Sequence, residues 1–355
     1  MSGKAARDTW INPVLALAMC ALAGVAFTWL RTPLPWMIGP LLAMAGANFA
    51  GARLRSIPGS RQVGQMIIGT ALGLYFTPAV TREVASYWLL LLIAALFAIF
   101  LAWGCAWFLS WTTDTDRTTA FFASVPGGAA EMAVLGERYG ARVDRIALAQ
   151  SLRILVVVIV VPFALTYSGV HGTDAYRPAT IPVAWQPLAL MLCLATAAGA
   201  VLSAARIPNS FMFGPLMVAI ALTANGVQFS SMPTWLSSLG QLLLGCALGS
   251  RFEQQFLSGV TRYVGAVFAS ILLAIAMAAV FGVGLAQVAG LSTASLILAT
   301  APGGIAEMCI TAKVLELGVP LVTAAHVTRV VVLMTTTAPI YRWVAGLSGA
   351  ARRRK

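Results

Sequence analysis

Four long apolar runs limit what this chain can fold into more than any other feature. They are Trp88–Leu109, Ile146–Leu165, Leu188–Ala205 and Tyr263–Val288, and each matches the roughly 20 residues of helix that cross a bilayer. Composition excludes a water-soluble domain, because 59% of the residues are hydrophobic and 10% are charged, whereas soluble domains have about 45–50% and 25%. The sequence therefore predicts an all-α polytopic membrane protein that has the lipid bilayer as its partner.

The formal net charge of +12 raises nucleic acid as a second partner. The basic residues, however, lie between apolar runs or at the chain ends, as do residues that set membrane orientation, and they form no basic helix. We therefore expect no nucleic acid partner. The cysteines form no CxxC pair and all lie in apolar stretches, so neither a disulfide framework nor a zinc site is expected, and we predict no metal and no cofactor; they are Cys20, Cys105, Cys193, Cys246 and Cys309.

A shift of 176 residues superimposes the chain on itself. The segment from Pro126 to Met132 then matches the segment from Pro302 to Met308 at six of seven positions, and other pairs follow in the same order. The matched pairs are Gly64-Gln65 with Gly240-Gln241, Gly69 with Gly245, Gly73 with Gly249, Arg153 with Arg329 and, one residue off this register, Gly39-Pro40 with Gly214-Pro215. Such a match predicts a tandem duplication, with a first membrane repeat at 1–176, a second at 177–355 and a junction near His171–Pro182.

Each repeat contains six apolar elements, the fifth of which carries Pro-Gly-Gly and is expected to be a broken or re-entrant helix. We count Ile11–Leu30 as a retained first span because it exceeds the core of a signal peptide. If the fifth elements do not cross, 17 of the 23 Lys and Arg residues lie in the cytoplasm and 4 lie outside; if all elements cross, the numbers are 12 and 9. The positive-inside rule favours the first arrangement. If the third elements do not cross instead, the numbers are 15 and 6, so the rule selects an odd number of crossings in each repeat and leaves open which element does not cross. The first arrangement has inverted repeats and places both termini in the cytoplasm.

The Pro-Gly-Gly segments are the first candidate site, and their residues are Pro126, Gly127, Gly128, Pro302, Gly303 and Gly304. The glycines allow a positive φ, and a helix that begins there directs free N–H groups and a positive dipole end into the protein. Glu131 and Glu307 follow within two turns. Two interpretations stay open: each segment is a hinge whose glutamate pairs with a neighbouring charge, or it binds a substrate anion or a coupling ion.

Four further side chains lie in the sixth elements. Arg153 and Arg329 each follow a glutamate by 22 residues, and Gln150 and His326 each precede an arginine by three, on the same helix face. We expect the arginines to pair with Glu131 and Glu307, either as structural salt bridges or as part of a substrate site. His326 is either a hydrogen-bonded core residue or a proton relay.

The third elements add two glutamines. Gln65 and Gln241 lie on faces with small-xxx-small spacing, which close helix packing explains best, although each amide is also a candidate ligand for a solute.

SVPGGAAEM at 124–132, TAPGGIAEM at 300–308, the glycine faces and the downstream arginines resemble the AbrB family of bacterial inner-membrane proteins. The resemblance covers nearly the whole chain. It implies a duplicated membrane domain in the inner membrane and a label either as a regulator of gene expression or as an ammonia monooxygenase. The family shares its name with a soluble DNA-binding regulator, which this chain does not resemble.

Two functional classes fit the residues. The first is a secondary transporter of a small, anionic solute, with the broken segments at a midplane site; the second is a membrane sensor that affects gene expression indirectly. An oxygenase needs a cluster of His, Cys or carboxylate ligands that the sequence does not provide, so we expect no enzyme. A small-molecule or ion substrate is expected in either class, and a homo-oligomer is compatible with both. Convergence of both Pro-Gly-Gly segments on one polar cavity favours transport.

Overall fold

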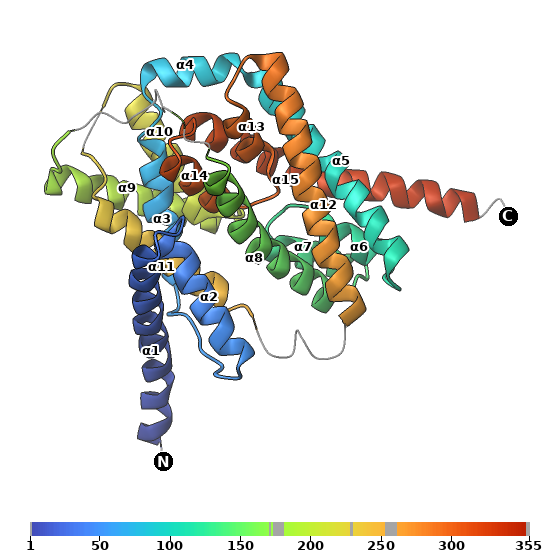
Figure 1. Ribbon diagram of the computed structural model, residues 1–355, viewed down its shortest axis with the longest axis horizontal. Coiled ribbons are helices and arrows are strands. Elements are labelled where there is room, and N and C mark those ends of the chain that lie inside the picture. The colour runs from blue at the N-terminus through green and yellow to red at the C-terminus, as the bar shows by residue number, and fades with distance from the viewer. Residues whose placement is uncertain (1, 170–171, 173–180, 228–229, 253–260, 353–355) are drawn as a thin grey trace.

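The computed structural model describes residues 2–169, 172, 181–227, 230–252 and 261–352. Within these ranges every regular element is a helix (Figure 1), which confirms the predicted all-α class. The boundary expected between residues 176 and 177 falls outside the described residues.

The first half of the chain has eight helices rather than the six expected apolar elements. The fourth element is preceded by a short separate helix, α4, and the fifth is divided into α6 and α7. The helices are α1 (Ser2–Trp29), α2 (Pro35–Phe49), α3 (Ser60–Gly73), α4 (Pro78–Ser86), α5 (Trp88–Thr112), α6 (Arg117–Ser124), α7 (Ala129–Arg138) and α8 (Val143–Tyr167).

The second half repeats this order, with similar helix lengths. Its described helices are α9 (Trp185–Ala204), α10 (Ser210–Ala224), α11 (Thr234–Gly249), α12 (Thr261–Ala289), α13 (Thr293–Thr300), α14 (Ile305–Val314) and α15 (Val319–Arg352). A counterpart of α4 would fall within residues 253–260, outside the described residues. Even the turns correspond, because Leu34 before α2 and Asn209 before α10 both have left-handed backbones, with φ of 49° and 51°.

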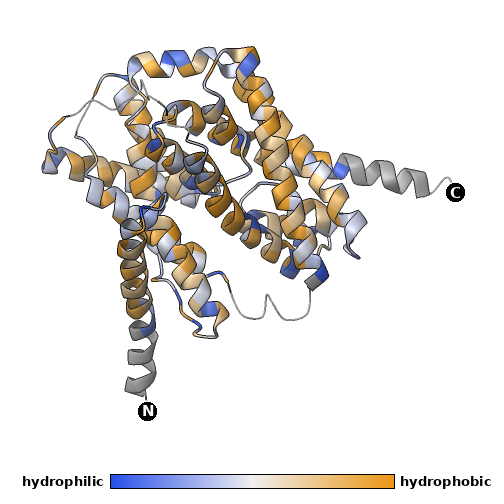
Figure 2. Cartoon of the chain, viewed as in Figure 1, coloured by the Kyte–Doolittle hydropathy of each residue, from blue (hydrophilic) through white to orange (hydrophobic). Residues whose placement is uncertain are grey.

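Six helices are long and apolar enough to cross a membrane, and α3 with α4 forms a further candidate span that bends by 91°. Several of the long helices expose large apolar side chains, such as Trp103 and Trp107 of α5 and Val280 of α12. Figure 2 shows hydrophobic residues along the outer helices as well as in the interior. Exposed apolar surface of this extent is what lipid-facing helices present, so the chain is a multi-pass membrane protein.

The two halves pack on each other through glycines at repeat-related positions. A methyl group added at Gly73 of α3 would lie 2.9 Å from the carbonyl oxygen of Leu216 in α10, and one added at Gly249 of α11 would lie 2.7 Å from that of Leu41 in α2. The small-xxx-small faces therefore serve close helix packing, as predicted. Reciprocal contacts of this kind are what a duplicated chain would give; the duplication and the opposite orientation of the halves stay predictions.

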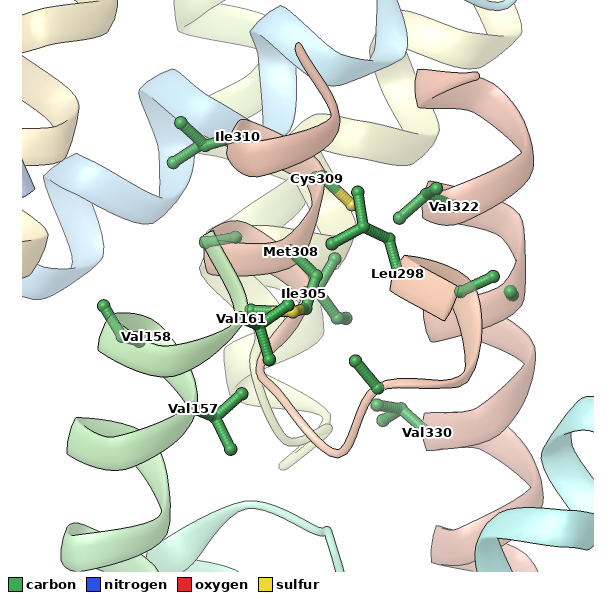
Figure 3. Packing of buried hydrophobic residues seen from close by; sticks show 14 of the residues in the cluster. Val157, Val158, Val161, Leu298, Ile305, Met308, Cys309, Ile310, Val322 and Val330 are labelled. Carbon is green, nitrogen blue, oxygen red and sulfur yellow. The ribbon is translucent and has the colours of Figure 1, made fainter. Parts of the chain in front are cut away.

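The largest apolar cluster of the interior is shared by both halves. Val157 and Val161 of α8 face Ile305 and Met308 at the start of α14, with α13 and α15 on the far side (Figure 3). Because a buried helix surrounded by close-packed side chains has little freedom to shift, this packing fixes the Pro-Gly-Gly segment before α14.

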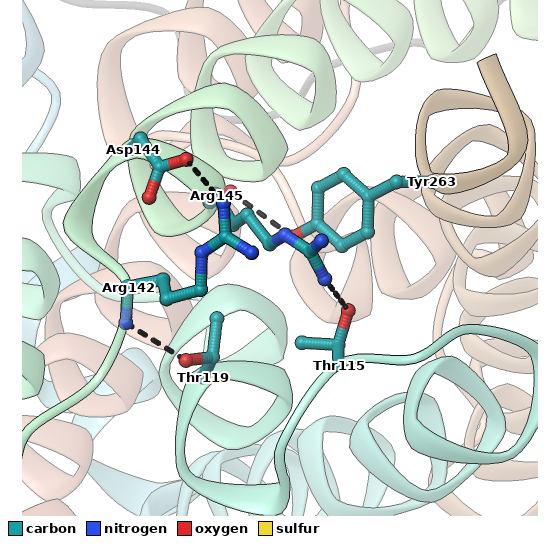
Figure 4. A network of polar contacts seen from close by, with 6 residues as sticks. All are labelled: Thr115, Thr119, Arg142, Asp144, Arg145 and Tyr263. Carbon is teal, nitrogen blue, oxygen red and sulfur yellow. Dashed lines mark hydrogen bonds and ion pairs between the residues drawn. The ribbon is translucent and has the colours of Figure 1, made fainter. Parts of the chain in front are cut away.

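A network of polar contacts surrounds the base of the broken segment formed by α6 and α7 (Figure 4). Arg145 donates to Thr115 Oγ1 at 2.7 Å, and its backbone oxygen accepts the Tyr263 hydroxyl at 3.0 Å. The backbone N–H of Arg142 donates to Thr119 Oγ1 at 2.9 Å. These bonds tie the loop before α6 and the start of α8 to α12, so the α6–α7 hairpin is anchored at its base.

Candidate functional site

Both Pro-Gly-Gly segments interrupt a helix, as predicted. α6 ends at Ser124 and α7 begins at Ala129, while α13 ends at Thr300 and α14 begins at Ile305. An interruption leaves the last carbonyls of one helix and the first N–H groups of the next without helical partners. In an apolar interior these groups need other partners, and side chains supply them at both breaks.

The buried arginines bind the free carbonyls. Arg153 donates through Nη1 to the oxygen of Val125 at 2.8 Å and through Nη2 to that of Gly127 at 3.2 Å. Arg329 does the same with the repeat-related oxygens, to Ala301 at 2.5 Å and to Gly303. The planar guanidinium suits this double contact, and its charge lies beside the negative end of a helix dipole.

Gln150 and His326 occupy equivalent positions and donate to equivalent atoms. Gln150 Nε2 donates to the oxygen of Phe122 at 2.9 Å, and His326 Nε2 contacts that of Leu298 at 2.9 Å. A carbonyl oxygen only accepts, so Nε2 carries the hydrogen, while Nδ1 is buried with no partner among the described residues. His326 therefore acts as a neutral backbone donor here, which corresponds to the core-residue interpretation.

The glutamates do not form the expected ion pairs with Arg153 and Arg329 in the described part of the chain. Glu131 and Glu307 are the third residues of α7 and α14, and each carboxylate folds back over the glycine that precedes its own helix, Gly128 or Gly304. A glutamate at this position caps a helix N-terminus and is stabilised by the positive dipole end. The carbonyls of the break, which the sequence does not reveal, are the arginines' partners instead.

The backbone angles of the Pro-Gly-Gly glycines also differ from the expectation. None of Gly127, Gly128, Gly303 and Gly304 has a positive φ. A methyl group at Gly128 or Gly304 would instead overlap the folded-back carboxylate, and one at Gly127 would lie 2.8 Å from the Met132 side chain. The motif therefore needs glycine for space and not for backbone angle.

Both breaks line one cavity of about 100 Å³. This volume exceeds the roughly 10–15 Å³ that one water molecule needs, so the cavity has room for a small solute. Its polar and charged lining residues come from both halves and are Arg61, Gln65, Arg153, Asn209, Arg251, Glu307 and Arg329, beside the two Pro-Gly-Gly segments. Gln150, Gln241, His326 and Glu131 were also candidates and do not line it.

The sequence profile of one family, described as "Transition state regulatory protein AbrB", matches residues 36–345. The chain belongs to the AbrB family. It is 27% identical to "Uncharacterized protein YhjN" of Bacillus subtilis (strain 168), over 98% of this chain and 96% of the relative. It is 25% identical to "Putative regulator AbrB" of Escherichia coli (strain K12), over 94% of this chain and 97% of that protein. No solved structure matches the chain.

Arg61, Asn209 and Arg251 are cavity residues of this AbrB-family chain that sequence reasoning missed. Arg61 and Arg251 flank apolar elements and were therefore counted only as cytoplasmic loop charges. The sequence offered one signal for them: the positions 176 residues away hold Ser237 and Tyr75, so neither arginine is matched in the predicted duplication. A charge that departs from an otherwise repeated pattern is a candidate for a one-sided function.

The charge of the cavity in this AbrB-family protein is strongly positive. Four arginines line it against the single carboxylate of Glu307, which Arg61, Arg251 and Arg329 all attract electrostatically. Charges interact more strongly in a partly buried site than in water, and they favour a ligand of the opposite sign. The arrangement can therefore hold an anion.

Behind the breaks lies a second, smaller cavity of about 30 Å³. Pro126, Arg153 and Pro302 line both cavities, and the rest of the small one is mostly apolar, with Cys105 and Ser270 among its lining residues. The two Pro-Gly-Gly segments therefore separate a polar space from an apolar one.

Proposed function

We propose that this AbrB-family membrane protein is a secondary transporter of a small anionic solute, and that it is not an enzyme. One observation carries the proposal: the broken helix of each half contributes its Pro-Gly-Gly segment to the same cavity. Broken helices that meet between two halves of a transporter provide substrate and ion sites because their free backbone groups and dipole ends face the ligand.

The charge balance supports an anion as the transported species. Four arginines line the cavity with one glutamate, Glu307, while Glu131 lies at the neighbouring break without lining it. Even if Glu131 is counted, two positive charges are in excess in a partly buried space. The excess attracts an anion from solution and opposes entry of a cation. A glutamate beside the cavity provides a group that can exchange a proton or bind sodium, and we assign coupling to Glu307 and Glu131.

Orientation follows from the charge count. With both termini in the cytoplasm of a bacterial cell and the protein in the inner membrane, Arg61 and Arg251 lie on the cytoplasmic side. Both are half-buried at the cavity. The conformation described here is then the one that faces the cytoplasm, and the opposite conformation would open the other face of the two breaks.

The sensor alternative rests on the name of the Escherichia coli relative, which calls that protein a regulator. A sensor would bind the same solute in the same cavity without moving it across the membrane. Transport and sensing therefore differ in one measurable property, namely flux.

The test is uptake of labelled pyruvate, succinate and phosphate into proteoliposomes, with and without an imposed pH or sodium gradient, against protein-free liposomes. We expect gradient-driven uptake of at least one anion by the wild type. Glu307→Gln and Glu131→Gln keep a capping side chain, and at least one of them should abolish the gradient dependence. Binding without flux under every gradient would replace the transporter by the sensor.

A further inference from the structure

The helix N-termini at the breaks are already occupied. The carboxylates of Glu131 and Glu307 fold over Gly128 and Gly304, the positions where a bound anion would otherwise meet the first free N–H groups of α7 and α14. A helix N-terminus that is capped by its own glutamate has few free N–H groups left to bind a second anion. Recognition of a substrate anion therefore falls to other groups in the cavity.

The terminal hydrogen-bond donors of Arg153 and Arg329 are also already in use. Each donates both terminal nitrogens to carbonyl oxygens of its break and is at most 9% exposed. If Arg329 turned towards a solute, the buried oxygens of Ala301 and Gly303 would lose their side-chain donor. If Arg153 turned, the oxygen of Gly127 would lose its donor, whereas that of Val125 would keep Gln150 Nε2 and the Gly127 N–H. Such losses are costly in an apolar interior. The positive charges of the two arginines contribute to the electrostatic field in the cavity, but their terminal N–H groups are not available to bind the solute.

Of the charged side chains that line the cavity, Arg61 and Arg251 are the two cations that remain. Arg61 lies in the first turn of α3 and Arg251 lies two residues beyond the end of α11. Ser250, just after α11, is joined to Ser56 in the loop before α3 by a hydrogen bond of 3.3 Å between their Oγ atoms. The two guanidinium groups repel each other electrostatically. Neither makes a hydrogen bond or an ion pair with another described residue. Two neighbouring cations at a cavity form a site that an anion would stabilise.

The apolar part of the cavity lining limits the rest of the ligand. It is formed by side chains without hydrogen-bond donors, those of Met212, Leu244, Leu248, Ile305 and Val330. An inorganic anion would leave part of its polar surface against these apolar side chains without hydrogen-bond partners, whereas an aliphatic chain would pack favourably against them.

We propose that Arg61 and Arg251 together bind the carboxylate of the solute, and that the solute is a small carboxylate with a short aliphatic chain. This inference rests on the proposed transport function and deepens it by naming the substrate class. Planar guanidinium groups pair with a carboxylate through parallel hydrogen bonds, which supports this choice over a spherical anion. Because Arg61 and Arg251 also attract Glu307, the solute and Glu307 compete for the same two cations.

The test is equilibrium binding of valerate to the purified full-length protein, followed by the shift in its melting temperature. The wild type should bind valerate more tightly than acetate, and should bind neither phosphate nor pentylamine over the same range. Arg61→Gln and Arg251→Gln should each weaken valerate binding about tenfold, the worth of one charge-assisted hydrogen bond. Arg61→Lys and Arg251→Lys keep the charge and should lose less.

Two variants provide the controls. Arg82→Gln removes an equal charge from an exposed position on α4 and should leave binding unchanged. Glu307→Gln removes the competing carboxylate and should tighten binding, a gain that a merely misfolded variant cannot give. Equal affinity for phosphate and valerate would overturn the substrate class, and unchanged binding in both Arg→Gln variants would overturn the arginine pair.

The two proposals can fail separately. If valerate binds as described but no carboxylate crosses the bilayer under any gradient, transport fails and the recognition pair stands. If gradient-driven anion uptake persists unchanged in both Arg61→Gln and Arg251→Gln, transport stands and the recognition pair fails.

Discussion

Gly304 precedes α14 directly beneath the carboxylate of Glu307, and Gly128 has the same place before α7. A side chain at either position must displace a capping group from a helix N-terminus. Space for a carboxylate, and not freedom of φ, is thus the physical requirement that the two Pro-Gly-Gly motifs share.

We predict that Gly304→Ala destabilises the protein by about 1 kcal/mol, the usual worth of a helix cap. The matched control is Gly104→Ala in α5, where an added methyl group meets nothing within 4 Å. There the gain in helix propensity, about 0.5–1 kcal/mol, should leave stability equal or higher. Melting of both variants in detergent provides the comparison, and an equal loss in both would contradict the capping role.

His326 gives a second residue-scale prediction. His326→Gln should preserve both stability and gradient-driven uptake, because Gln150 already makes the equivalent bond in the first half. His326→Leu should lose about 1 kcal/mol of stability, because the oxygen of Leu298 loses its 2.9 Å bond to the ring and keeps only the 3.3 Å bond from the Ala301 N–H. Loss of gradient coupling in His326→Gln, with the fold intact, would instead make the ring a proton relay.

Sequence reasoning identified Arg153, Arg329 and Glu307 but not the partners of the arginines, and it missed two other charged residues of the cavity, Arg61 and Arg251. Glu131 and Arg153 carry opposite charges in one apolar region, so pairing them was the simplest prediction. Backbone carbonyls are invisible to such reasoning, because their availability depends on where a helix ends in three dimensions. Arg61 was missed for a related reason, since a charge beside an apolar run looks the same in a loop and in a cavity.

At the scale of helices, the glycine faces of α3 and α11 control how closely the two halves approach. Gly73→Ala should destabilise the protein by about 1–3 kcal/mol through overpacking, because the added methyl group would overlap the Ala219 side chain. Gly46→Ala in α2 meets nothing within 4 Å and is the control. Folded yield and melting temperature distinguish the two, and equal behaviour would show that the face is not tightly packed.

Helix breaks were more predictable than helix number. Pro-Gly-Gly removes an amide hydrogen and two side chains at one point, so the interruption before α7 and α14 follows from local chemistry. α4 was not predicted because its pattern is amphipathic rather than apolar, although Thr77 followed by Pro78 is a recognisable start, with Thr77 accepting the N–H of Val80 at 3.4 Å. The 91° bend between α3 and α4 comes from tertiary packing that no local pattern encodes.

At the scale of the whole molecule, the two helices that follow the breaks, α7 and α14, differ in how deeply they are buried. α14 buries eight residues, Ile305–Ala312, whereas α7 buries only Met132 and Gly136. If the halves are copies of one unit, as predicted, this difference fits the proposed transporter seen in one of two states, with one face of the breaks open and the other closed. In the proposed cycle the environments of α7 and α14 exchange as the cavity changes sides.

The account depends centrally on two oppositely oriented halves that bring their broken helices to one cavity. Arg117 and Thr293 are the first residues of the repeat-related helices α6 and α13, and both are exposed. The decisive measurement is labelling of Arg117→Cys and Thr293→Cys, each in a chain without its native cysteines, by a membrane-impermeant thiol reagent in sealed vesicles of known orientation. The account predicts labelling of Arg117→Cys from the cytoplasmic face and of Thr293→Cys from the opposite face; labelling of both from the same face would contradict it.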